Sequence, residues 1–159
     1  MSQRYSTAGM YLCYAVETTA GTRPTTGYTQ IPEIKSMPSF NPSPETIDST
    51  TLLETTFRTY VEGLKDFGGS LEFGANLTAD LITAWETCNT AHDTAAASSK
   101  ETWFAVVHPK LAKAVFFKGD PAPLGMNEAS VGSMLETTLY VTPNSEPEWQ
   151  TKPTITGAT

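Results

Sequence analysis

The chain has 159 residues, a length typical of one domain that folds around its own hydrophobic core. Hydrophobic residues make up 39% of it and charged residues only 17%, and the formal net charge of −7 argues against a protein that grips the phosphate backbone of nucleic acids. Threonine is frequent, and this β-branched, half-polar composition predicts a mainly β fold.

The N-terminal residues 1–8 are polar and without pattern, so we expect them to be irregular. They lack the apolar centre of a signal peptide, and no apolar run approaches the ~18 residues that a membrane span needs. We therefore expect no membrane partner and a protein made in a reducing cytoplasm. There, the distant Cys13 and Cys88 are predicted to be free buried thiols.

The first strand is predicted at residues 10–16, which are apolar on both faces, and a loop rich in glycine and proline follows over 17–28. Residues 31–37 are predicted as a second strand, provided that Pro32 lies at its start and Pro38 at its end. Prolines 42 and 44 then interrupt the chain before a long polar segment.

That segment, residues 45–66, is predicted to be an extended arm. Residues 46–53 and 57–64 can pair as an antiparallel hairpin around residues 54–56. Its apolar side chains, among them Ile47, Leu52, Tyr60 and Leu64, are too sparse for a core, and an isolated two-stranded ribbon is marginal in water. The arm therefore needs a surface to lie on. The residues alone leave open whether this surface is its own domain or an adjacent copy.

The second half of the chain is predicted to hold one helix among four strands. Residues 71–77 alternate, with Glu72 and Asn76 on the polar face, and Thr78 is a plausible N-cap for a helix over 79–91. Residues 102–107 and 112–118 are apolar on both faces and predict central strands, and residues 133–142 predict the last one. The tail over 143–159 is predicted to be irregular, with Trp149 as an anchor.

We find no candidate for chemistry. The two histidines, His92 and His108, are too few for a three-histidine metal site and are followed by turn residues, so we expect solvated loop histidines. No P-loop, dinucleotide-binding or nucleophile-elbow motif occurs. We therefore expect no enzyme and no catalytic, cofactor-binding or metal-binding residue.

Four phrases in series carry a family resemblance: Tyr14–Glu17 (YAVE), Ile31–Pro38 (IPEIKSMP), Glu45–Thr50 (ETIDST) and Gly63–Gly69 (GLKDFGG). In this order and spacing the chain resembles the tail tube proteins, or major tail proteins, of long-tailed, siphovirus-like bacteriophages. The resemblance covers about half of the chain by motif and all of it by layout.

The resemblance implies a single tail tube domain over 1–159. Its fold would be a β-sandwich or half-barrel with one flanking helix and an inter-subunit arm over 45–66. Such domains close into hexameric rings that stack into a hollow tube, the conduit for genome delivery. Ile47, Leu52, Tyr60 and Leu64 would then be inter-subunit contacts, and Glu72 and Asn76 are candidates to face the lumen.

The implied partners are other copies of the chain, a tape measure protein, a tail terminator, and baseplate or distal tail proteins. Double-stranded DNA would pass without specific binding, since an acidic wall repels it. The acidity has a simpler explanation in solubility alone. The implied location is the virion tail, after a stay in the host cytoplasm before assembly.

Three alternatives remain open. The chain could be the inner tube of a contractile tail or of a tail-like bacteriocin, in which case a sheath would coat it. It could be a secretion-system tube, whose cargo is protein. It could also be a monomeric ligand-binding β-sandwich, which would stay monomeric at high concentration.

Overall fold

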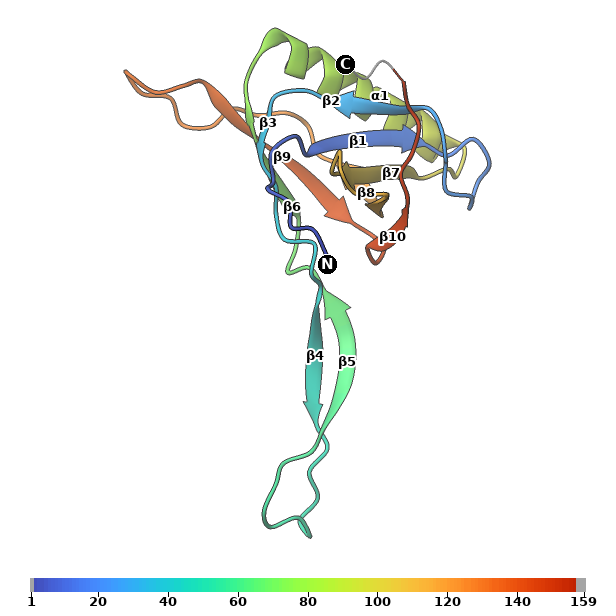
Figure 1. The fold of residues 1–159 in the computed structure, drawn as a ribbon, viewed down its shortest axis with the longest axis vertical. Coiled ribbons are helices and arrows are strands. Elements are labelled where there is room, and N and C mark those ends of the chain that lie inside the picture. Colours follow the sequence, from blue (N-terminus) through green and yellow to red (C-terminus); the bar gives the residue numbers. More distant parts are fainter. Residues whose placement is uncertain (1, 157–159) are drawn as a thin grey trace.

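The structure, a computed structural model, describes residues 2–156 and is mainly β, with one helix in that range (Figure 1). The strands are β1 (Tyr11–Val16), β2 (Tyr28–Ile31), β3 (Ile34–Ser36), β4 (Ser43–Asp48), β5 (Tyr60–Asp66), β6 (Leu71–Asn76), β7 (Thr102–Val107), β8 (Lys113–Pro121), β9 (Glu136–Pro143), β10 (Glu148–Thr151) and β11 (Ile155–Thr156). The helix is α1 (Ala79–Ala97).

Among the described residues, nine strands form one curled sheet and β4 and β5 form a separate ribbon. The sheet order is β11-β2-β1-β7-β8-β9-β6-β3, with β10 also paired to β8. The first part of β8 pairs with β7 and β10, and its last residues, from Gly119, pair with β9. The strands cross closely there, because a Cβ at Gly119 would lie 2.5 Å from the Val141 side chain. This change of partner curls the sheet into the predicted half-barrel.

The main core lies between the two halves of the sheet and α1. Phe104 and Phe117 stack with ring centroids 5.7 Å apart, and Phe73 from β6 closes the cluster on the opposite side. Trp85 of α1 is fully buried and donates its indole N–H to the Ala122 carbonyl at 2.8 Å. Each such side chain stabilises the fold by roughly 1.5–3 kcal/mol through burial.

A second cluster, with Tyr28, Trp103 and Phe116, covers the other face of β1, β7 and β8. The loop between β1 and β2 helps to close it, since the Arg23 guanidinium lies 4.3 Å above the Phe116 ring. All residues of β7 are buried, so the prediction of a central strand over 102–107 is confirmed.

Helix α1 begins as predicted but continues further. Thr78 accepts a hydrogen bond from the Leu81 amide at 3.2 Å, and Leu81, Trp85 and Cys88 face the core. The predicted end at residue 91 is wrong, because the helix continues to Ala97 through alanines, the best helix formers. Within residues 2–156, no helix combines the length and the apolar character needed to cross a membrane.

Two other sequence-based expectations need correction. The strand predicted over 31–37 is broken at Glu33, whose φ is 67°, so that β2 pairs with β1 while β3 pairs with β6. The tail over 143–159 is not irregular throughout, because β10 pairs with β8 and β11 pairs with β2. Residues 157–159 of that tail, and residue 1 of the predicted irregular N-terminus, lie outside the described residues.

Candidate assembly surface

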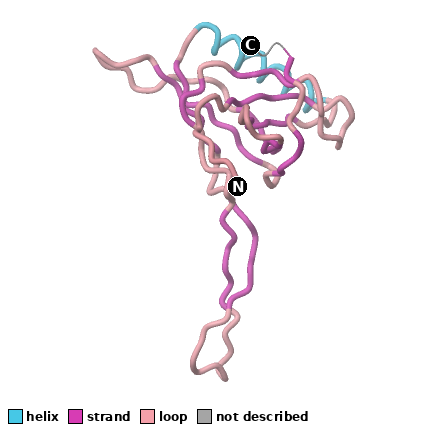
Figure 2. The backbone as a smooth tube through the Cα atoms, viewed as in Figure 1, coloured by secondary structure: helices cyan, strands magenta, loops and turns pink. Residues whose placement is uncertain are grey.

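The arm projects away from the body as a two-stranded ribbon with a loop at its far end (Figure 2). In the ribbon Ile47 pairs with Val61 and Asp48 with Tyr60, and the register shifts between Pro44 and Thr46. All residues of β4 are exposed, and none of β5 is fully buried. The arm therefore contributes nothing to the hydrophobic core.

The arm nevertheless carries large apolar side chains. Leu52 and Leu53 in the loop are 102% and 92% exposed, and Phe57 is 84% exposed. Further apolar side chains stand exposed along the strands, namely Ile47, Tyr60, Val61 and Leu64. Exposed apolar side chains gathered in one segment are typical of interaction surfaces.

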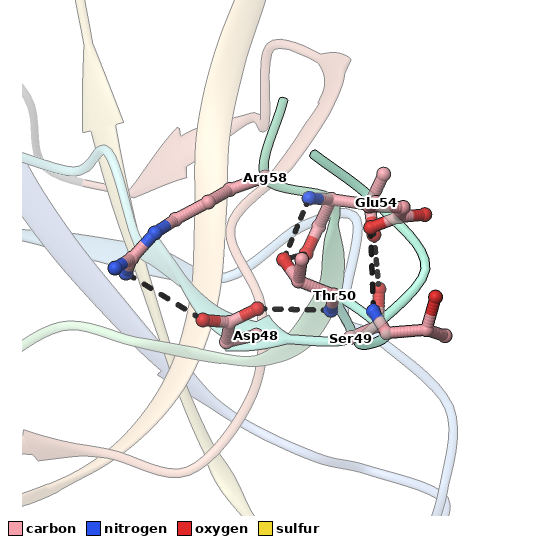
Figure 3. Close-up of polar contacts among 7 residues, drawn as sticks. Asp48, Ser49, Thr50, Glu54 and Arg58 are labelled. Carbon is pink, nitrogen blue, oxygen red and sulfur yellow. Dashed lines mark hydrogen bonds and ion pairs between the residues drawn. The ribbon is translucent and has the colours of Figure 1, made fainter. Parts of the chain in front are cut away.

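The end of the arm, residues 49–59, is a structured loop and not the short turn that we predicted. Thr59 donates its amide to the Thr50 hydroxyl at 2.9 Å, and the Glu54 carboxylate accepts from the Thr51 amide at 3.3 Å and from the Thr59 hydroxyl at 3.1 Å (Figure 3). Asp48 accepts from the Thr50 amide at 2.9 Å. These bonds hold the loop without a core, so Leu52, Leu53 and Phe57 are presented in a fixed arrangement.

The hydrogen bonds from the Thr50 hydroxyl and amide lower the pKa of Asp48, because they stabilise its ionised form. Arg58 lies 3.7 Å from the same carboxylate. Both charges are solvated, so this pair orients the loop more than it stabilises it.

The four predicted contact residues do not lie on one face. Ile47 faces the same side as Val61, whereas Tyr60 faces the opposite side with Asp48. Leu64 lies beside the register shift, and Leu52 lies in the end loop beyond both strands. All four are more than half exposed, so they are available for contact on every side of the arm.

The two predicted lumen residues do share a face. Glu72 and Asn76 on β6 alternate with the buried Leu71, Phe73 and Ala75. The backbone N–H of Asn76 donates to the Glu33 carbonyl at 3.0 Å, and its side-chain amide donates to the Glu33 carboxylate at 3.5 Å, whereas Glu72 is exposed. The polar outer face of this half of the sheet is therefore confirmed, and its position in an assembly stays a prediction.

A second segment, residues 122–135 between β8 and β9, also projects from the body and was not predicted from the sequence (Figure 1). Met126, Val131 and Met134 are 65%, 106% and 70% exposed. The segment is held at its base by the Asn127 amide, which donates to the Glu136 carbonyl at 3.1 Å. The signal in the sequence that could have found it is the scatter of Met126, Val131 and Met134 through a stretch with neither strand nor helix periodicity.

The histidines are not solvated as predicted. His108 is buried, its Nδ1 accepts from the Lys110 amide at 3.1 Å and its Nε2 therefore donates to the Ser6 carbonyl at 2.7 Å. The Nδ1 atom of His92 lies 2.9 Å from the Thr102 hydroxyl. Both rings hold neighbouring segments together. Across residues 2–156, no group of three side chains is arranged to hold a metal ion.

A buried carboxylate lies on the body, away from the arm. Glu17 accepts from the Glu101 amide at 2.8 Å, the Trp103 indole at 3.2 Å and the Gly21 amide at 3.3 Å. Burial raises the pKa of Glu17, but these three hydrogen bonds and the nearby Lys118 outweigh it, so the pKa lies below its ordinary value. Lys118 in turn lies 2.7 Å from Glu101. This cluster fixes the start of the loop that covers the second core.

Among solved structures, the chain is similar to a chain of the anti-feeding prophage (AFP) baseplate, a six-fold symmetrised cryo-EM structure. The TM-score is 0.63, and the match covers 95% of this chain and 98% of that chain at 10% sequence identity. This chain shares the fold of that baseplate protein. No protein-family model and no curated protein sequence matches the chain.

Proposed function

We propose that this chain is a structural subunit of a phage tail or tail-like particle, and that copies of it associate through the arm. The observation that carries the proposal is the arm itself, which exposes seven large apolar side chains and buries none. A soluble chain rarely exposes such a group unless a partner covers it. We infer a structural role and not an enzymatic one.

In its fuller form, the proposal is that six copies close into a ring and that rings stack into a hollow tube. The six-fold symmetrised structure of the similar baseplate supports rings of six. Glu72 and Asn76 would face the channel, and double-stranded DNA would pass the acidic wall without specific binding. Tape measure, tail terminator and distal tail or baseplate proteins would be its further partners, and the virion tail its location.

The decisive experiment compares wild-type chain with the variant Leu52→Asp/Leu64→Asp at high concentration by negative-stain electron microscopy. We expect hollow, uniformly wide tubes from the wild type and a folded monomer from the variant, because two charges enter surfaces that should be buried. The matched control is Ile82→Asp, an exposed apolar residue on α1, which should still assemble. Tubes formed by the double variant would contradict the role of the arm.

A second candidate is a subunit of a baseplate or of the inner tube of a contractile tail or tail-like bacteriocin, which the likeness to a baseplate chain favours. A baseplate subunit should form single rings that do not stack. An inner tube should form tubes that a sheath protein coats. A secretion-system tube would carry protein, and a ligand-binding sandwich would stay monomeric under all these conditions.

A further inference from the structure

The end of the arm needs a receiving surface, and one groove on the body fits it. The groove lies between β10, the turn after β7 and the segment before β4, and its lining includes Met10, Phe40, Leu111, Val115 and Trp149. We call it the Trp149 groove. We propose that it receives the arm loop of a second copy of this chain, an inference that rests on the proposed function and names the partner site of the arm.

The chemistry of the groove is apolar. Phe40 lines the groove and packs against the core rings of Phe73 and Phe117, with centroids 6.0 and 5.6 Å away. Trp149 lies on the short edge strand β10 and is 59% exposed. Interface hot spots are typically large aromatic side chains, and Trp149 is such a side chain, partly exposed beside an apolar groove.

The size of the groove suits the arm loop. Its volume is about 240 Å³, and a cavity of about 150 Å³ is enough to hold benzene. One ring such as that of Phe57, or one leucine side chain, therefore fits. The arm loop offers Leu52, Leu53 and Phe57 together, so one can enter the groove while the others cover its rim.

The charges are complementary. Two basic side chains of this acidic chain lie at one end of the groove: Lys113 lines it, and the Lys152 ammonium donates to the Pro109 carbonyl in the adjacent turn. The arm, residues 43–66, carries five acidic and two basic side chains, a net charge of −3. A basic rim around an apolar groove thus matches an acidic arm with an apolar end.

The arm cannot fill the groove of its own chain, because its end loop lies at the far end of a ribbon that leads away from the body (Figure 1). Each copy therefore contributes one arm, which binds a second copy, and one groove, which binds the arm of another copy. This is a head-to-tail contact, which produces either a closed ring or an open stack.

Complementation between two disabled chains tests the proposal. In the first, Lys113→Glu/Trp149→Glu disables the groove at two exposed positions and leaves the arm intact. In the second, an Asn-Gly turn replaces residues 49–59 and joins the paired Asp48 and Tyr60, which is the two-residue loop that suits such a hairpin. We expect each chain to be a folded monomer alone and the 1:1 mixture to form a heterodimer that salt weakens.

The readout is analytical ultracentrifugation, with near-ultraviolet circular dichroism to verify folding. The matched control is Lys100→Glu, at the opposite end of β7, which should assemble as the wild type does. Self-assembly of the groove variant alone, or a mixture that stays monomeric while the wild type assembles, overturns the groove and leaves the proposed function standing. A wild-type chain that stays monomeric at all concentrations overturns both.

Discussion

At the scale of single residues, Glu17 links the body's stability to pH. Its pKa is lower in the folded chain than in the unfolded chain, so folding favours the ionised carboxylate. This contribution is complete above the ordinary carboxyl pKa and disappears as the pH falls through the lower folded value. Glu17→Gln should lower the free energy of unfolding at pH 7 by on the order of 1–2 kcal/mol and flatten its decline in acid.

Urea unfolding of both proteins, followed by tryptophan fluorescence between pH 3 and 7, measures this difference. The control is Trp103→Phe, which keeps an aromatic side chain but removes one donor to the carboxylate. It should reduce the pH dependence only in part. Parallel stability curves for wild type and Glu17→Gln would show that the carboxylate carries no such linkage.

The two cysteines give a second prediction at this scale. Burial raises the pKa of Cys13 and of Cys88 to about 12, so neither is a thiolate at neutral pH. A thiol reagent at pH 8 should label neither cysteine in the folded protein and both in denaturant. Rapid labelling of one thiol under native conditions would mean that its part of the core opens.

At the scale of secondary-structure elements, the cap of α1 is testable. Thr78→Ala removes the acceptor for the Leu81 amide and should cost about 1 kcal/mol of stability. Thr83→Ala, at an exposed position in the same helix, should cost nothing, because alanine is the better helix former. Thermal unfolding of the two variants separates a lost cap from a general effect of replacing threonine.

The elements that could be predicted from the sequence are those with a local cause. The strict alternation of residues 71–77 predicted β6 with its buried and polar faces, and Thr78 predicted the start of α1. The misses have a non-local cause. Strands β10 and β11 have only four and two residues and form by pairing with β8 and β2. The break at Glu33 separates β2, which pairs with β1, from β3, which pairs with β6.

The candidate assembly surface was predictable in part for the same reason. Sparse apolar residues in a polar segment indicated an unsupported arm, and the ribbon is present with those residues exposed. The shape of its end loop depends on side-chain bonds such as that of Glu54 to Thr59, which no propensity predicts. The Trp149 groove joins residues from four separate parts of the chain, so no single stretch of sequence reveals it.

At the scale of the whole molecule, the face that carries Glu72 gives a prediction about transport. Glu72→Lys in the assembled particle should leave assembly intact, because the side chain is exposed and belongs neither to the arm nor to the lining of the Trp149 groove. If this face lines a DNA channel, the new positive charges should slow DNA ejection. The measurement is the rate of DNA ejection from particles that carry Glu72→Lys, with particles that carry Lys100→Glu as the control. An unchanged rate would argue against a channel position for this face.

The register shift near Pro44 has a consequence for copies that have not yet assembled. The outer edge of β4 in the ribbon has unpaired backbone groups, and strands of other chains could pair with such an edge and aggregate. Pro44 has no amide hydrogen to offer, and the irregular pairing beside it leaves only Thr46–Asp48 as a regular run on that edge. So short a run gives foreign strands little to pair with, which disfavours aggregation of free subunits through the β4 edge.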